Sequence, residues 1–168
     1  TTIWSDHLLG RPENRMTGVS FTRGGYHRIG KRVTAGAGGY TVHRADHWLF
    51  DGTGLTYGDV LGAAATAVGY ECDGCQLEWR DGLPFPTFKD GTPETFEVLA
   101  SCPARWHHAD VEWYEKWERG RTGAACLGFY TRGGTVFTAG TTDWAHGLRG
   151  GDPVVERVTK NVMDRLSR

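Results

Sequence analysis

The sequence predicts an α+β fold, with a mixed, mainly antiparallel sheet, a loop-rich first half and one C-terminal amphipathic helix packed on the sheet. Three observations support this fold. Residues 153–166 carry an apolar stripe at helical spacing, made of Val154, Val155, Val158, Val162 and Leu166. Residues 125–131 and 135–139 are apolar runs joined by a short glycine-containing connection, which favours an antiparallel hairpin. Glycine supplies 25 of the 168 residues, which indicates many tight turns.

The first half of the chain predicts short strands separated by turns. We expect strands at 16–21 and 40–43, with a glycine-rich segment at 35–39 between them. That segment lacks a following helix and a Lys-Ser/Thr pair, so it does not match a phosphate-binding loop. Residues 43–50 either continue the second strand or make one helical turn, and residues 51–62 form a turn-rich loop.

The middle of the chain predicts two further strands. Residues 81–93 contain three prolines and are therefore irregular or lie at a sheet edge. Residues 96–100 form a strand. Residues 109–117 alternate apolar and polar side chains and predict another strand, although their apolar residues three positions apart would also share one face of a helix.

The C-terminal strand runs into a polar loop that carries Asp143, Trp144 and His146, and the predicted helix follows this loop. Asp152 suits the N-cap of that helix and Pro153 suits its first turn. Ligands of open α/β sheets bind where the carboxyl end of a strand gives way to such a loop. The loop is therefore the place where the sequence best predicts chemistry.

Composition argues against several classes of function. The formal net charge of −1 gives no electrostatic footprint for nucleic acid. No apolar run approaches the ~20 residues that a membrane span needs, and the first residues do not match a signal peptide. Four cysteines do not make a disulfide scaffold in a chain of this size, so we expect a cytoplasmic location. The chain is most simply one domain, 1–168.

Asp143 and His146 are the candidate catalytic residues, because three positions in a loop bring a carboxylate within reach of an imidazole. In this hypothesis Asp143 orients His146, which acts as a base or binds substrate. The structural alternative is that Asp143 bonds loop amides and His146 packs on Trp144. Trp144, Glu71 and His47 are the candidate substrate-binding residues.

Two other polar clusters have both a functional and a structural interpretation. His43 and His47 would share one face of a helix and, with Asp46, hold a metal ion, or they are buried and hydrogen-bonded. Glu71 and Asp73 would point the same way in a strand and serve as an acid–base pair. We favour a turn at Asp73 and the glycine after it.

The cysteines and the first residue raise two further alternatives. A zinc site would take its ligands from Cys72 and Cys75, then Cys102, then His107 or His108. Only the first two form a close pair, and structural zinc sites usually show a second one. Thr1 as an N-terminal nucleophile would need a buried strand, whereas the sequence after it is loop-like. We favour neither.

Four segments of the sequence together carry a family resemblance. They are 10–12 with 16–21, 47–55 with 58–59, 68–74, and 136–148 running into 158–166. The last begins Val136-Phe-Thr-Ala-Gly-Thr-Thr-Asp-Trp-Ala-His and is the most specific, and Thr92-Pro93 and residues 100–104 lie between the others in the expected order. The chain resembles the C-terminal region of the N,N-dimethylformamidase large (beta) subunit family.

That resemblance implies a large amidohydrolase subunit with a glutamine-amidotransferase-like α/β core and a mononuclear iron held by two tyrosines and a glutamate. The iron-binding part of the family lies upstream of the matched region, in a His-Pro-Glu-Tyr-Trp-type segment that this sequence does not contain. No iron ligand is carried over, although residues of the right type are present: Tyr26, Tyr40, Tyr70 and Glu71. We expect no cofactor within this chain.

The leading hypothesis is the C-terminal region of a dimethylformamidase-like hydrolase of small amides, which shapes the pocket more than it carries the metal. Its expected partners are the rest of the same polypeptide or a partner subunit, and such a chain would be incomplete as a catalyst alone. The alternative is a non-catalytic binding or assembly module that uses a Trp-rich contact surface.

Overall fold

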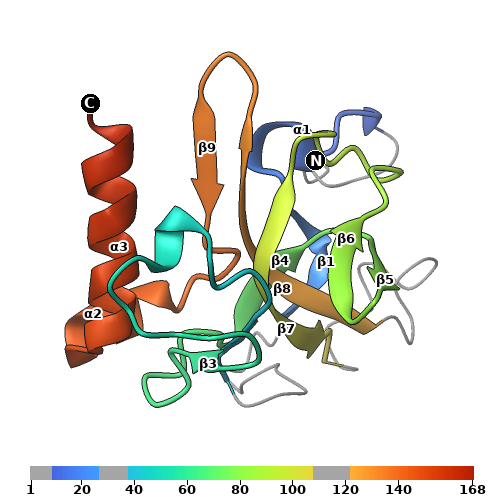
Figure 1. Cartoon of the computed structure of the whole chain (residues 1–168). Coiled ribbons are helices and arrows are strands. Elements are labelled where there is room, and N and C mark those ends of the chain that lie inside the picture. The colour runs from blue at the N-terminus through green and yellow to red at the C-terminus, as the bar shows by residue number, and fades with distance from the viewer. Residues whose placement is uncertain (1–8, 27–37, 108–121) are drawn as a thin grey trace.

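The computed structural model describes residues 9–26, 38–107 and 122–168, and a five-stranded antiparallel sheet lies at its centre (Figure 1). The strand order is β3-β2-β7-β8-β9. The strands are β2 (Tyr40–Val42), β3 (Val60–Leu61), β7 (Glu97–Arg105), β8 (Thr122–Thr131) and β9 (Thr135–Thr138). The β7–β8 pair, with its register shift between Val98 and Ala100, forms the backbone of this sheet.

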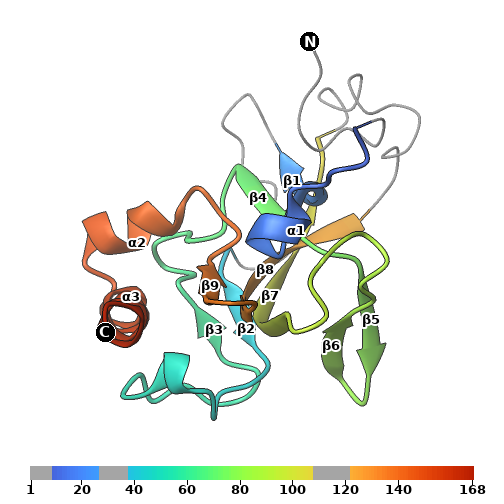
Figure 2. The ribbon, with the colours of Figure 1, turned by 90° about the horizontal axis from the view of Figure 1, so that it is seen from above.

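Two smaller antiparallel pairs accompany the main sheet. One joins β1 (Ser20–Tyr26) to β4 (Glu71–Gly74), and the other joins β5 (Leu77–Arg80) to β6 (Leu83–Pro86). An isolated bridge between Cys72 and Thr141 ties β4 to the segment after β9. In both views the β5–β6 hairpin and the C-terminal helix lie at opposite sides of the five-stranded sheet (Figures 1 and 2).

Glycines let the β1–β4 pair approach β8 more closely than any side chain would allow. A Cβ placed on Gly74 would lie 1.9 Å from the carbonyl oxygen of Ala124, and one on Gly123 would lie 2.2 Å from that of Arg23. Both obstacles are backbone atoms, which cannot rotate away as a side chain can. The glycines therefore fix how closely β4 can pack against β8, and β4 carries part of the site described below.

Four helical segments complete the described part of the chain: α1 (Asn14–Thr17), the 3-10 turn η2 (Trp48–Phe50), α2 (Trp144–Gly150) and α3 (Pro153–Leu166). The Asp152 carboxylate caps α3 by accepting hydrogen bonds from the backbone N–H groups of Val154 and Val155. The side-chain amide of Asn161 in α3 donates to the backbone carbonyls of Leu49 in η2 and of Asp51 directly after it, and so joins the two segments. None of these helices is long and apolar enough to cross a membrane.

The main sheet has a hydrophobic core on each face, because side chains alternate along its strands. On one face Leu127 and Val42 pack with Val155 and Val158 of α3. On the other face Cys126 packs in a smaller cluster, whose remaining buried members are Val19, Cys75, Phe96, Val98 and Tyr130. The apolar stripe of α3 therefore packs on one face only, and the opposite face is covered in part by Val19 before β1, Cys75 after β4 and Leu77 of β5.

The α+β class, the C-terminal helix and the hairpin predicted from sequence are confirmed. The strand predicted at 96–100 is also present and extends to Arg105. The prediction at 16–21 is wrong in its first half, because residues 14–17 form α1 and the strand begins at Ser20. The proline-rich segment 81–93 contributes β6 to a two-stranded hairpin, where prolines cost no central ladder bond.

Three further expectations need correction. The polar loop expected around Trp144 and His146 is instead helix α2, with Asp143 at its N-cap position. The turn favoured at Asp73 is instead strand β4. Every strand pairing among the described residues is antiparallel, so the sheets do not support a glutamine-amidotransferase-like α/β core, which would contain parallel pairs. The strand expected at 109–117 lies outside the described residues.

Candidate functional site

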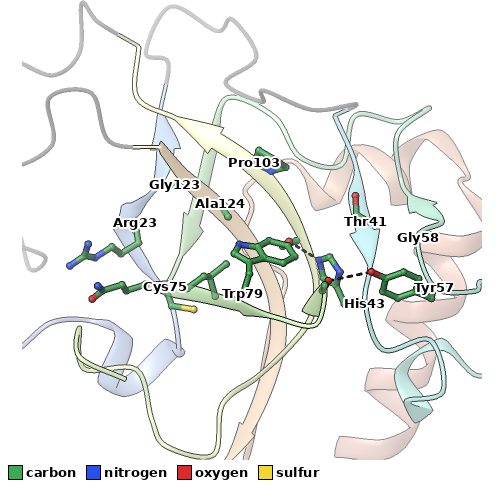
Figure 3. Close-up of a pocket in the computed structure, with 14 residues that line it drawn as sticks. Arg23, Thr41, His43, Tyr57, Gly58, Cys75, Trp79, Pro103, Gly123 and Ala124 are labelled. Carbon is green, nitrogen blue, oxygen red and sulfur yellow. Dashed lines mark hydrogen bonds between the residues drawn. The ribbon is translucent and has the colours of Figure 1, made fainter. Parts of the chain in front are cut away.

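A hollow lies between the main sheet and the β5–β6 hairpin, and we call it the His43 pocket (Figure 3). Its volume is about 580 Å³. Its lining residues are Arg23, Thr41, His43, Tyr57, Gly58, Cys75, Gln76, Leu77, Trp79, Gly82, Ser101, Pro103, Gly123 and Ala124. Most of this lining is apolar, as in pockets that bind small molecules.

A histidine and a serine from neighbouring strands meet in this pocket. His43 directly follows β2, Ser101 lies in β7, and His43 Nε2 is 2.8 Å from Ser101 Oγ. Both residues are buried, with exposed fractions of 7% and 4%. Burial, aided by the neighbouring Arg44 charge, lowers the pKa of His43 to about 4. The imidazole is therefore neutral at physiological pH.

The second ring nitrogen of His43 decides which way the hydrogen bond runs. Nδ1 is buried and has no hydrogen-bond partner within the described part of the chain. A neutral imidazole carries one proton, so either an Nδ1–H or the Ser101 O–H is left without an acceptor among the described residues. Nδ1 is sealed from solvent, whereas Ser101 lines the pocket, where its O–H can reach solvent or a ligand. We therefore assign the proton to Nε2, which donates to Ser101 Oγ. Ser101 then keeps its own O–H for a different acceptor.

Aromatic side chains border the pocket. The ring of Trp79 meets His43 edge to face, with 5.5 Å between the ring centroids. The hydroxyl of Tyr57 donates to the carbonyl oxygen of Gly82 at 3.2 Å and so connects the β2–β3 loop to the turn of the hairpin (Figure 3). Arg23 also lines the pocket, and its guanidinium lies 3.8 Å from the Asp90 carboxylate.

A second hollow lies where β4 meets the segment after β9, and we call it the Glu71 pocket. Its volume is about 280 Å³, and its lining includes Glu71, Asp73 and Thr142. Burial and then the Asp143 charge raise the pKa of Glu71. Burial, followed by repulsion from Glu71 and Glu13, raises the pKa of Asp73 to about 6. This hollow is acidic and holds protons at higher pH than exposed carboxylates do.

Asp143 lies directly beside the Glu71 pocket. Its carboxylate is buried and accepts a hydrogen bond from the backbone N–H of Tyr70, with 3.0 Å between N and Oδ2. A Cβ on Gly69 would lie 1.2 Å from that same oxygen, so the glycine makes room for the carboxylate. Asp143 therefore fixes the segment before β4 to the start of α2.

His146 follows Asp143 by one helical turn. Its Nδ1 lies 3.9 Å from Asp143 Oδ1, and 58% of its side chain is exposed. Trp144 turns the other way, since its indole N–H donates to Thr159 of α3 at 3.0 Å. Asp143 thus bonds a backbone amide and also lies near His146, so the two interpretations offered for this residue are compatible.

The sequence-predicted residues divide into two places. Asp143 lies near His146 and acts electrostatically on Glu71, whereas Trp144 anchors α2 to α3. His47 lies elsewhere: its Nδ1 accepts the backbone N–H of Leu49 at the start of η2. Its ring packs on Phe129 with 4.6 Å between centroids, and burial lowers its pKa. The catalytic and substrate-binding roles of these residues stay predictions.

The geometry of the described residues does not support the predicted metal sites. His43 and His47 do not share a helix, since one follows β2 and the other precedes η2. Within the described ranges no group of three or more His, Cys, Asp or Glu side chains could hold a metal ion. The four cysteines are free and buried, and burial raises the pKa values of Cys72 and Cys102, so these thiols stay protonated at physiological pH. His108 and Thr1 lie outside the described residues.

The tyrosine-and-glutamate iron site implied by the resemblance was tested against the same geometry. A tyrosine must lose its proton to bind a metal, but burial raises the pKa of Tyr40 and its hydroxyl donates to the carbonyl oxygen of Ala139. Tyr26 and Tyr70 contact each other through their rings. We assign no iron ligand to this chain.

The sequence interpretation missed the pairing of His43 with Ser101. The two residues are 58 positions apart, so no local motif reveals them. A signal was present in the alternation of β2, where Tyr40 and Val42 are apolar and therefore place Thr41 and His43 on the opposite face. The partner strand and its register came only from the fold.

One comparison identifies the family of this chain. The family model described as N,N-dimethylformamidase beta subunit-like, C-terminal matches residues 1–160. No curated protein matches the chain significantly. The family match covers nearly the whole sequence and agrees with the resemblance carried by its four segments. The chain therefore belongs to the N,N-dimethylformamidase beta subunit-like C-terminal family.

Proposed function

We propose that this chain is the C-terminal region of an amidohydrolase that acts on small amides, and that it shapes the pocket rather than holding the metal. The observation that carries the proposal is that the Asp143 carboxylate lies 3.9 Å from His146 and that its charge acts on Glu71, which lines a polar hollow, in a chain of the dimethylformamidase-like family. Asp143 is common to all of these contacts. It lies close enough to Glu71 to raise its pKa and 3.9 Å from His146.

Amide hydrolysis requires proton transfer twice, once from the attacking water and once to the leaving amine. Glu71 suits such a role because its raised pKa brings proton exchange closer to neutral pH. In this proposal His146 accepts or delivers the second proton, and Asp143 orients its ring through Nδ1. Trp144 and His47 lie in different places, and each is proposed to contact substrate only where further protein brings the substrate to it.

The rest of the catalyst is proposed to come from other parts of the same polypeptide or from a partner subunit. A mononuclear iron in the full-length protein would supply Lewis-acid activation of the amide carbonyl. The glutamine-amidotransferase-like core implied by the resemblance would belong to that other part. Four free thiols support a reducing compartment, the cytoplasm, as its place.

The test uses N,N-dimethylformamide hydrolysis, followed as dimethylamine release, by the native protein that contains this chain. His146→Ala and Glu71→Gln should each lower kcat/KM by about 100-fold or more, the usual contribution of a general acid or base. Glu71→Gln should also shift the acidic limb of the pH profile. Arg149→Ala on α2 and Glu156→Gln on α3 are exposed controls and should leave activity unchanged. Full activity in both site variants would contradict the proposal.

A specific observation favours a second function, that of a non-catalytic binding or assembly module. Trp79 and Tyr57 are 59% and 61% exposed, so the chain does present aromatic surface. Trp106 is buried, however, and Trp144 is bonded to α3, which leaves the Trp-rich surface smaller than composition suggested. This second function would be favoured if the native protein showed no amidase activity and all of the site variants were folded.

A further inference from the structure

The His43 pocket has the size and lining of a small-molecule site that is separate from the proposed acid–base residues. Its volume of about 580 Å³ falls in the range of pockets that take drug-sized ligands, roughly 300–1,000 Å³. It is built on rigid parts of the fold, since β2, β7 and β8 form its floor and the β5–β6 hairpin forms one wall. None of Glu71, Asp143 and His146 lines it.

The charges around the pocket favour an uncharged ligand. His43 is neutral, and Arg23 is the only other basic side chain among the lining residues that the structure describes. The Asp90 carboxylate, 3.8 Å from Arg23, offsets that charge. No carboxylate is among the described lining residues. An anion or a cation would therefore lose its hydration without gaining an opposite charge.

One polar group on the floor of the pocket can recognise such a ligand. With the proton assigned to Nε2, His43 donates to Ser101 Oγ, and the serine O–H is left to donate to a ligand in the pocket that Ser101 lines. This arrangement makes Ser101 a donor rather than a nucleophile. A nucleophilic serine would need an unprotonated Nε2 and an acidic partner on Nδ1, and Nδ1 has none among the described residues.

Aromatic and apolar groups surround that donor. Trp79 packs edge to face on His43 and yet is 59% exposed, so much of its ring surface is available to another flat group. Tyr57 lines the opposite side and is tied to Gly82. Leu77, Ala124 and Pro103 supply the remaining apolar contacts. Such walls bind aromatic bodies through burial and offset or edge contacts.

We propose that the His43 pocket binds an uncharged, ring-bearing small molecule whose hydrogen-bond acceptor, such as a carbonyl oxygen, is held by the Ser101 hydroxyl, with the ring against Trp79. The ligand differs in size and shape from the small amide of the proposed reaction. Binding here requires no hydrolysis, so this inference stands or falls independently of the proposed function.

Three matched probes test the proposal on the chain: 2-acetylnaphthalene, 2-ethylnaphthalene and 2-naphthoate. They share one ring system and differ in carrying a neutral acceptor, no acceptor or a negative charge. Titration followed by tryptophan fluorescence and by nuclear magnetic resonance shifts of the Trp79 indole should give binding in the order acetyl, ethyl, naphthoate. Naphthoate binding most tightly, or no probe binding at all, would overturn the proposal.

Variants then locate the two contacts. Ser101→Ala should weaken 2-acetylnaphthalene about 5- to 10-fold and leave 2-ethylnaphthalene unchanged, because one hydrogen bond is lost. Ser101→Thr keeps a hydroxyl and should retain the preference for the acetyl probe. Trp79→Ala should weaken both neutral probes together. Met163→Ala, on the exposed side of α3, is the matched apolar control and should change neither.

Two results would contradict the role given to Ser101. One is an unchanged preference for the acetyl probe in a folded Ser101→Ala variant, as checked by circular dichroism. The other is covalent labelling of Ser101 by a fluorophosphonate, which would make the serine a nucleophile. Amidase activity is not a readout in either case, so failure here leaves the proposed function untouched.

Discussion

The His43 pocket and the Glu71 pocket lie on the same small fold but have opposite electrostatic character. In the first, burial keeps a histidine neutral by lowering its pKa to about 4. In the second, burial and like charges raise the pKa of Asp73 to about 6, so this carboxylate holds its proton to higher pH than an exposed one. Low polarity acts in both places, and in both it disfavours the charged form. The electrostatic difference between the pockets comes from the neighbouring side chains. Aromatic and apolar groups surround His43, whereas further carboxylates surround Asp73.

One strand connects the two pockets. Glu71 and Asp73 of β4 line the Glu71 pocket, and Cys75, directly after β4, lines the His43 pocket. Gly74 lies between them and packs on the backbone of β8. The two pockets therefore share β4 and the residue after it as part of their walls, although their chemistry is distinct.

Gly74→Ala should have the largest effect and damage both pockets at once. Its Cβ would lie 1.9 Å from the carbonyl oxygen of Ala124, so β4 must move away from β8. We expect a loss of at least about 3 kcal/mol in the free energy of unfolding, measured by urea denaturation. Gly134→Ala in the β8–β9 turn is the control, since nothing lies within 4 Å of its added Cβ. Equal stabilities of the two variants would refute the tight packing of β4 on β8.

Asp73→Asn and His43→Gln should change the pH dependence of folding stability in opposite directions. The raised pKa of Asp73 means that the folded state holds the proton more tightly, so its contribution to stability falls as pH rises from about 4 to 6. The lowered pKa of His43 means the reverse, so its contribution to stability rises from about pH 4 to 6.5. Each shift corresponds to roughly 3 kcal/mol at most.

These two opposing trends predict opposite results in the variants. Relative to the natural chain, Asp73→Asn should gain stability as pH is raised from 4 to 7, whereas His43→Gln should gain as pH is lowered from 7 to 4. Urea unfolding at pH 4, 5, 6 and 7 measures both. Parallel pH profiles for the two variants would mean that the pockets do not differ in the way described.

Asp143→Ala should destabilise the protein by about 1–3 kcal/mol, because the partly buried N–H of Tyr70 loses its buried carboxylate acceptor. Asp143→Asn keeps an acceptor oxygen and should lose less. His146→Ala, at a side chain that is 58% exposed, should change stability by less than about 0.5 kcal/mol. Thermal unfolding compares all three. A large loss for His146→Ala would assign that residue a structural role in place of a chemical one.

Tyr57→Phe should have the smallest effect and should be confined to the His43 pocket. It removes the hydrogen bond to Gly82, which is worth about 0.5 kcal/mol at an exposed position. Amide hydrogen exchange should become faster in residues 77–86 and remain unchanged in β4. Faster exchange in β4 instead would show that this bond supports the other pocket.

Local patterns in the sequence predicted the elements that need only their own residues. Helix α3 follows from its apolar stripe and from Asp152, and the β8–β9 hairpin follows from two apolar runs and a short turn. Helix α2 was missed because glycines at 147 and 150 lower helical propensity. Gly147 is nevertheless required, since a Cβ there would lie 2.7 Å from Val155 of α3.

The sequence predicted individual residues of the site, but it did not predict which residues contact one another. Asp143 was singled out by its position near a strand end, but its partner Tyr70 is 73 residues away. The pair Glu71 and Asp73 was weighed as a strand or a turn, and only pairing with β1 decided for the strand. Their side chains then face one hollow because residues two apart in a strand point the same way.

By itself the sequence determined the α+β class, the capped C-terminal helix, the hairpin before it and the family to which the chain belongs, because these depend on spacing and order along the chain. The tertiary structure alone decided that His43 meets Ser101, that Asp143 meets Tyr70 and that burial shifts the pKa values of His43 and Asp73 in opposite directions. Burial and long-range contacts are properties of the packed chain, since they arise from residues that sequence separates by 58 and 73 positions.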